Sequence, residues 1–182
     1  MEYMFSLLSH RTRRRIPRGF TLIEILVVVA IISLLALVAY ASADQARKKA
    51  RDDERLSSLK QMQAAIEVYG QANGRYPEAG CSRGANVWTG HGSLYGSCAE
   101  YIEGIETLIS PLPVDPKSTA YGFIYRVDSA GTNYKLMSFN VLENRTVDAT
   151  SEYARYPSGC SSAMTGSATI SYAVSSPGAK CW

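Results

Sequence analysis

The sequence is poor in histidine and contains one long stretch with almost no charge. The two histidines, His10 and His91, lie in an arginine-rich segment and a glycine-rich segment, so a histidine-based metal or acid–base site is not expected. The four cysteines lack the closely spaced pairs that are typical of zinc sites. The sequence also contains no convincing pair of a nucleophile and a general base, as an enzyme of this kind would need. We therefore expect neither catalytic activity nor a cofactor.

Residues 20–43 contain no glycine or proline, and Glu24 is their single charged side chain. A helix of this length measures about 36 Å, which suffices to cross a hydrocarbon core of roughly 30 Å. A cleaved secretory signal is the competing interpretation, but the apolar stretch is long for one. The sequence therefore predicts a single membrane-spanning helix over residues 20–43.

The basic side chains are concentrated at the N-terminus. Residues 1–19 hold five arginines and one glutamate, whereas the whole chain has a net charge of +3. By the positive-inside rule this segment stays in the cytoplasm, and the C-terminal part lies outside the cytoplasmic (inner) membrane. Because the charge excess belongs to this short segment, we expect no specific nucleic-acid partner.

Helix-forming residues continue from residue 44 to residue 73. An apolar stripe with steps of three and four residues runs along this part and consists of Leu56, Leu59, Met62, Ile66 and Tyr69. Residues 47–55 are polar on all sides, which predicts an exposed stretch between the membrane and the domain. Asn73 and Gly74, followed by Pro77, predict the helix end. Residues 20–73 therefore read as one helix, about 80 Å long.

The remaining residues, 74–182, predict a small α+β domain. A glycine-rich loop over residues 80–98 precedes a predicted short helix over residues 99–109. Residues 121–128 and 134–141 are strand-like and flank a turn, which is typical of a β-hairpin. Residues 169–174 are a candidate third strand. The predicted fold is a long N-terminal helix packed on a small antiparallel sheet.

All four cysteines follow the apolar run, at Cys81, Cys98, Cys160 and Cys181. An even number of cysteines in a segment that is expected outside the cytoplasm predicts two disulfides. The alternative is four reduced thiols in a cytosolic protein. Three connectivities are possible, and chain order favours Cys81–Cys98 and Cys160–Cys181.

Several loop side chains carry oxygen atoms that could ligate calcium. They are Asp115, Asp128, Asn140, Glu143, Asn144 and Asp148. These residues lack the ordered spacing of a calcium-binding loop. We therefore predict solvated loop residues and no metal site, with calcium as the minor alternative.

The junction from Arg18 to Glu24, Arg-Gly-Phe-Thr-Leu-Ile-Glu, resembles the prepilin peptidase site of type IV pilins and related pseudopilins. The resemblance covers residues 11–77. It implies cleavage between Gly19 and Phe20 and N-methylation of Phe20. It also implies that Glu24 neutralises the Phe20 amine of a neighbouring subunit in a homo-oligomeric filament. The implied partners are the prepilin peptidase and methyltransferase, the inner-membrane assembly machinery, and membrane lipid before assembly.

The resemblance divides the chain into four parts. They are a cleaved basic leader (1–19), a membrane-spanning half-helix (20–43), an amphipathic half-helix (44–73) and a globular head with cysteine-closed loops (74–182). The implied function is a structural subunit of a cell-surface type IV pilus that serves motility, adhesion or DNA uptake. The alternatives are a pseudopilin of type II secretion and, more distantly, a single-span anchored binding module.

Calcium binding is expected to differ between the pilus subunit and the pseudopilin. Major pseudopilins characteristically hold calcium in the loop after the strands. The comparable region here, residues 140–148, lacks closely spaced acidic side chains. The Cys160–Cys181 disulfide is expected to order the tail instead, as in pilins with a disulfide-closed loop, which favours the pilus.

Overall fold

The computed structural model describes residues 19–182. Helix α1 extends from Leu22 to Asn73, close to the predicted range of residues 20–73. The chain divides into two compact units, Met1–Ser42 and Ala43–Trp182. Most of the predicted leader, residues 1–18, lies outside the described residues.

In the first unit, α1 is apolar and none of its side chains is buried. Within residues 19–182, α1 is the one helix that is long and apolar enough to cross a membrane, and its most apolar window has no buried residue. Ser33 lies within this window and donates its hydroxyl hydrogen to the Val29 carbonyl oxygen at 2.7 Å. Ser42 donates in the same way to the Val38 carbonyl oxygen at 3.0 Å, so both serine hydroxyls are satisfied inside the helix.

In the second unit, the predicted apolar stripe of α1 faces the core. Leu59, Met62 and Ile66 are fully buried, and Leu56 and Tyr69 pack against them while remaining partly exposed. This part of the prediction is confirmed. The helix ends because Gly74 adopts a left-handed conformation, with φ of 69°, which glycine tolerates without steric cost.

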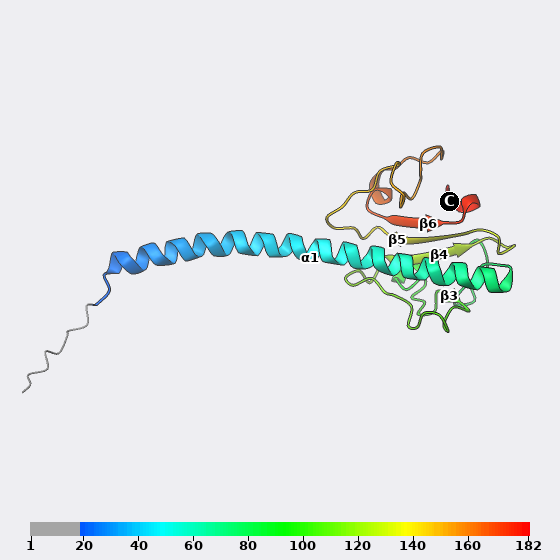
Figure 1. The fold of residues 1–182 in the computed structure, drawn as a ribbon, viewed down its shortest axis with the longest axis horizontal. Coiled ribbons are helices and arrows are strands. Elements are labelled where there is room, and N and C mark those ends of the chain that lie inside the picture. The colour runs from blue at the N-terminus through cyan, green and yellow to red at the C-terminus, as the bar shows by residue number, and fades with distance from the viewer. Residues whose placement is uncertain (1–18) are drawn as a thin grey trace, which may run out of the picture. The chain divides into compact units, whose positions relative to one another are not determined.

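A four-stranded antiparallel sheet covers this stripe (Figure 1). Its order is β2 (Thr89–Gly90), β4 (Gly122–Val127), β5 (Tyr134–Phe139) and β6 (Tyr172–Ser175). The predicted hairpin is β4–β5 and the predicted third strand is β6, so both are confirmed. Strand β2 was not predicted, because it is only two residues long within the glycine-rich loop. A separate pair is formed by β1 (Glu78–Ala79) and β3 (Ile102–Glu103).

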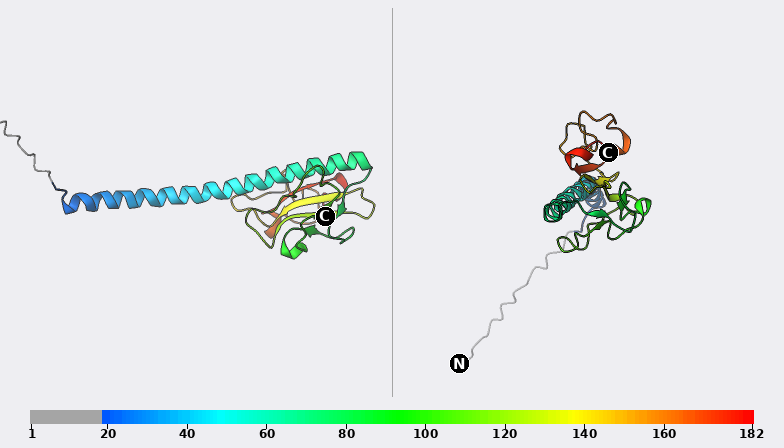
Figure 2. Two further views of the ribbon diagram at one scale, coloured as in Figure 1. Left: turned by 90° about the horizontal axis from the view of Figure 1, so that it is seen from below. Right: turned by 90° about the vertical axis from the view of Figure 1, so that its right-hand side faces the viewer.

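The two faces of the sheet bury different side chains. Phe123, Tyr125 and Leu136 belong to the core that includes α1, and Figure 2 shows α1 running along this face. Ile124 and Met137 lie on the opposite face in a second, smaller apolar cluster. This period-two alternation is what an antiparallel sheet with two covered faces requires. The predicted α+β fold is confirmed.

The predicted short helix over residues 99–109 is wrong. Residues 102–103 form strand β3, which pairs with β1, and Gly104 adopts a positive φ of 88° that no right-handed helix contains. The apolar residues that suggested a helical face, including Tyr101 and Ile105, are fully buried. Their burial explains the misleading periodicity, because a turn can bury the same side chains as a helix.

Candidate functional site

The first candidate site is the N-terminus of α1, where Glu24 caps its own helix. The backbone N–H of Glu24 donates to the Thr21 hydroxyl at 3.2 Å, and the backbone N–H of Thr21 donates to the Glu24 carboxylate at 3.4 Å. This reciprocal pair is a capping box, which satisfies two donors that a helix start leaves free. The T-x-x-E spacing from Thr21 to Glu24 is the sequence signal for a capping box. The role expected for Glu24 from the sequence was instead to neutralise the Phe20 amine of a neighbouring subunit.

The other sequence-predicted residues of this unit lie beside the capping box. Gly19 and Phe20 precede it and are exposed, with Phe20 at 77%. The large apolar side chains from Leu22 to Tyr40 are also exposed. A continuous apolar surface of this extent requires lipid or other protein chains around it.

The second candidate site is a group of charged side chains in the second unit, buried at its centre and exposed at Lys117. We call this group the ion cluster; it consists of Arg51, Asp52, Arg55, Asp115, Lys117 and Glu143. Its centre is Arg55, whose side chain is fully buried. The Arg55 guanidinium donates two hydrogen bonds to Asp115, at 2.7 Å and 3.0 Å. It also donates to Asp52 at 2.9 Å and to Glu143 at 3.2 Å.

Glu143 is the second centre of the ion cluster. Its carboxylate accepts two hydrogen bonds from Arg51, at 2.6 Å and 2.7 Å, and one from the Lys117 ammonium at 2.6 Å. The Asp52 carboxylate accepts the backbone N–H groups of Glu143 and Asn144. The ion cluster therefore fixes the segment after β5 onto helix α1.

The ion cluster is balanced in charge, because three cations face three carboxylates. Hydrogen bonds from Arg51, and then from Lys117 and Arg55, hold the pKa of Glu143 well below its usual range, although burial opposes this shift. Burial opposes the charge of Arg55, but its bonds to Asp115, Asp52 and Glu143 outweigh burial and raise its pKa. Arg51, Arg55 and Glu143 are thus held in their charged forms at neutral pH.

The ion cluster corrects two predictions. Residues 47–55 were expected to be exposed, yet Asp52 and Arg55 are fully buried. Asp115 and Glu143 were expected to be solvated, yet their side chains are 1% and 11% exposed. The sequence carried no local signal for this burial, because the partners that cover Arg55 from outside the helix, Asp115 and Glu143, lie 60 and 88 positions away along the chain.

The carboxylates of the ion cluster fit a calcium site poorly. Asp115 is bound bidentately by Arg55, and Glu143 contacts three cationic side chains. A calcium ion would need several of these oxygen atoms, which already accept charge-assisted hydrogen bonds. Of the other candidates, the Asp128 side chain accepts bonds from Thr132 and Asn133 within the β4–β5 turn. In residues 19–182 no group of three or more acidic, histidine or cysteine side chains is placed to hold a metal.

The four cysteines form two disulfides, Cys81–Cys98 and Cys160–Cys181. These are the two local pairings that chain order favours.

Ser82, beside Cys81, belongs to a Gly80-Cys-Ser-Arg-Gly84 stretch that matches the spacing of a hydrolase nucleophile motif. That motif needs its serine at a strand-to-helix turn, whereas Ser82 is exposed on the loop that the Cys81–Cys98 disulfide closes.

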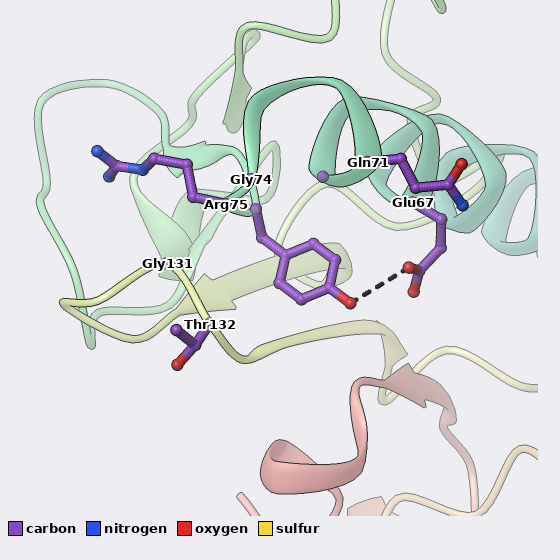
Figure 3. A pocket seen from close by; sticks show the side chains of 8 residues that line it. Glu67, Gln71, Gly74, Arg75, Gly131 and Thr132 are labelled. Carbon is purple, nitrogen blue, oxygen red and sulfur yellow. Dashed lines mark hydrogen bonds between the residues drawn. The ribbon is translucent and has the colours of Figure 1, made fainter.

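An open pocket of about 350 Å³ lies at the C-terminal end of α1. Figure 3 shows Glu67 in its wall, hydrogen-bonded to the Tyr76 hydroxyl. The Glu67 carboxylate also accepts a bond from Tyr134 at 2.7 Å. Its oxygens are thus engaged by two tyrosines, and the arrangement fixes the helix end to the sheet.

The chain is similar to known proteins both in its N-terminal segment and over much of its length. The family model described as the prokaryotic N-terminal methylation motif matches residues 14–40. The type II secretion system core protein G of Klebsiella michiganensis is 28% identical over 131 residues, which cover 69% of this chain and 77% of that protein. Core protein G of Escherichia coli is 31% identical over 104 residues, which cover 57% of this chain and 69% of that protein. No solved structure matches the chain significantly.

The matched motif and the similarity to core protein G agree with the exposed apolar helix and the α+β fold of the second unit. Type IV pilins and pseudopilins are structural subunits that form multimers, and they carry the motif for prepilin peptidase processing and N-terminal methylation. The chain belongs to the type IV pilin and pseudopilin family.

Proposed function

We propose that the chain is a pseudopilin, a subunit of a filament that serves protein secretion. The observation that carries the proposal is the extent of the similarity to type II secretion core protein G. It reaches 131 residues and therefore goes well beyond the methylation motif, which matches residues 14–40. This reverses the order of the two functions that the sequence alone favoured.

In this proposal the subunit is first inserted into the inner membrane. Residues 20–43 span the membrane once, with residues 44–182 outside the cytoplasm. A prepilin peptidase cuts between Gly19 and Phe20, and Phe20 is methylated. The exposed apolar surface of α1 then leaves lipid and packs among other copies in the filament. The chain acts through assembly and carries out no reaction of its own.

The type IV pilus remains the second candidate, and a specific observation favours it. The segment after β5 is held by the ion cluster, and the tail is closed by Cys160–Cys181. The resemblance to pseudopilins implied calcium in this region, whereas the carboxylates here are engaged by arginine and lysine.

A deletion strain separates the two candidates. Loss of the gene should abolish the export of specific proteins into the medium, and the wild-type chain should restore it. Unchanged secretion, together with loss of long surface filaments, twitching motility or DNA uptake, would transfer the assignment to the pilus. N-terminal sequencing in the same strains checks the processing step, which predicts mature protein beginning at methylated Phe20. Replacing Gly19 with leucine should leave uncut precursor in the membrane fraction.

A further inference from the structure

The face of the sheet opposite α1 carries cationic side chains among aromatic rings. We call these residues the outer cluster; they are Trp88, Arg126, Lys135, Arg155, Tyr156 and Trp182. The Arg126 guanidinium lies between two rings, with its central carbon 5.8 Å from the centre of the Trp88 ring and 4.9 Å from that of Trp182. Arg155 lies over Tyr156 at 4.9 Å in the same way.

Among the described residues, the two arginines of the outer cluster have no acidic partner. Arg126 and Arg155 take part in no ion pair there, and their buried Nε atoms have no hydrogen-bond partner. Lys135 is directly opposite Arg126 in the β4–β5 register. Like charges in directly opposed positions destabilise a sheet. Lys135 is buried and donates hydrogen bonds to the main-chain oxygen atoms of Arg155, Lys180 and Trp182. Arg126 is half-buried.

The β1–β3 pair contains the converse arrangement. Glu78 and Glu103 are directly opposite each other, and both are exposed. Glu78 has an exposed ion pair with Arg75 at 2.7 Å, which contributes little. Glu103 has no ion pair in the part of the chain that the structure describes. We call Glu78 and Glu103 the acidic pair.

We infer that the acidic pair of one copy binds the outer cluster of a second copy. The inference rests on the proposed function, because it requires that copies of the chain assemble. Each like-charge pair destabilises the isolated subunit, and the contact neutralises both at once. Arginine and tryptophan are enriched among the residues that dominate interface energetics. The two surfaces differ, so the contact is heterologous and can repeat along a filament.

Two charge reversals test the contact, Arg126→Glu and Glu103→Arg, in the full-length chain in its native cells. Glu103→Arg creates an opposite-charge pair with Glu78 at an exposed position, so thermal stability should stay unchanged or rise. Arg126→Glu creates such a pair with Lys135 but loses the packing between the Trp88 and Trp182 rings, so its assembly is measured at temperatures where thermal melts show it folded. Each also places like charges together at the proposed contact. The yield of sheared or cross-linked multimers should therefore fall roughly tenfold. Lower assembly without lower stability is not what a purely structural role produces.

The double variant carrying both reversals restores opposite charges across the contact and should recover most of the multimer yield. Arg83→Glu and Glu152→Arg are matched controls, because both residues are exposed and lie outside the two surfaces; they should assemble as the wild type does. Single reversals that assemble normally, or a double variant no better than either single one, would overturn the contact. If the wild-type chain itself formed no multimers, the proposed function would fail instead.

Discussion

Arg55 is a fully buried charge on helix α1, at the point where the polar stretch of residues 47–55 meets the apolar stripe. An isolated buried charge is very costly, and Arg55 is tolerated because Asp115, Asp52 and Glu143 surround it with hydrogen-bonded carboxylates. Buried pairs of this kind contribute less to net stability than their geometry suggests, but removing one partner leaves the others uncompensated. The ion cluster is therefore sensitive to single substitutions.

The Arg55→Ala substitution should lower the free energy of unfolding by about 3–5 kcal/mol, because it leaves buried carboxylates without their cation. Urea unfolding of the full chain in detergent can be followed by the emission of Trp88 and Trp182, the two tryptophans of the sequence, both in the second unit. Arg47→Ala, at an exposed position of the same helix, is the control and should change stability by no more than about 0.5 kcal/mol. An Arg55→Ala variant as stable as this control would contradict the role assigned to the ion cluster.

Glu143 makes the stability of the second unit depend on pH. Its pKa is lower in the folded chain than in the unfolded chain, chiefly through Arg51. The unfolded state therefore binds more protons below the ordinary glutamate pKa, and stability falls as the pH falls. We expect the contribution of Glu143 to be complete above about pH 5 and to decline progressively below it. Urea unfolding between pH 7 and pH 3 should show a weaker pH dependence in Glu143→Gln than in wild type. An identical pH dependence in the two proteins would refute this, and Glu152→Gln serves as the exposed control.

At the scale of elements, periodic patterns gave correct predictions where a long segment had one buried face. The stripe of α1 and the strands β4, β5 and β6 follow regular periods, so they were readable from the sequence. Residues 99–109 showed the same kind of apolar spacing but bury it through turns and strand β3. Short segments take their conformation from tertiary partners, here β1, and a local pattern does not contain that information.

The candidate sites follow the same division. Thr21 and Glu24 form a local capping box whose spacing was visible in the sequence. The ion cluster was not predictable, because Arg55 reaches Asp115 and Glu143 across long loops. The burial of a charged side chain depends on those distant partners. From the sequence alone, a run of mixed charges therefore predicts exposed side chains, and only the folded structure shows which of them are buried.

The Cys160–Cys181 disulfide closes 21 positions of the tail, including β6. In the chain-entropy model such a loop contributes about 3 kcal/mol, and the Cys81–Cys98 loop contributes a similar amount. Reductant should therefore lower the melting temperature of the second unit clearly, whereas a calcium chelator should leave it nearly unchanged. Thermal melts of the full chain, followed by tryptophan emission, provide the measurement. A large loss of stability in chelator that added calcium reverses would contradict this and would indicate a metal site. Recovery of free thiols or crossed pairs in non-reducing peptide mapping would contradict the pairing.

At the scale of the whole molecule, the proposed assembly would bring the start of α1 next to other copies. Glu24 then has two candidate roles. In the isolated chain it caps its own helix together with Thr21. After the proposed cleavage, Phe20 carries a new amine, and Glu24 of one copy can neutralise the Phe20 amine of its neighbour. The first role needs only a hydrogen-bond acceptor, whereas the second needs a negative charge.

Glutamine distinguishes these roles, because it can replace glutamate in a capping box but carries no charge. We expect Glu24→Gln and Glu24→Ala to be inserted and cleaved normally, since the cleavage junction at Gly19 and Phe20 is unchanged. Both should assemble poorly, because burying an amine without a neutralising carboxylate is costly within a helix bundle. The measurement combines N-terminal sequencing of the membrane fraction with the yield of sheared filaments. Thr21→Ala, which removes the capping hydroxyl but keeps the carboxylate, is the matched control and should assemble far better than either Glu24 variant. Wild-type assembly of Glu24→Gln together with failure of Thr21→Ala would assign Glu24 to capping alone.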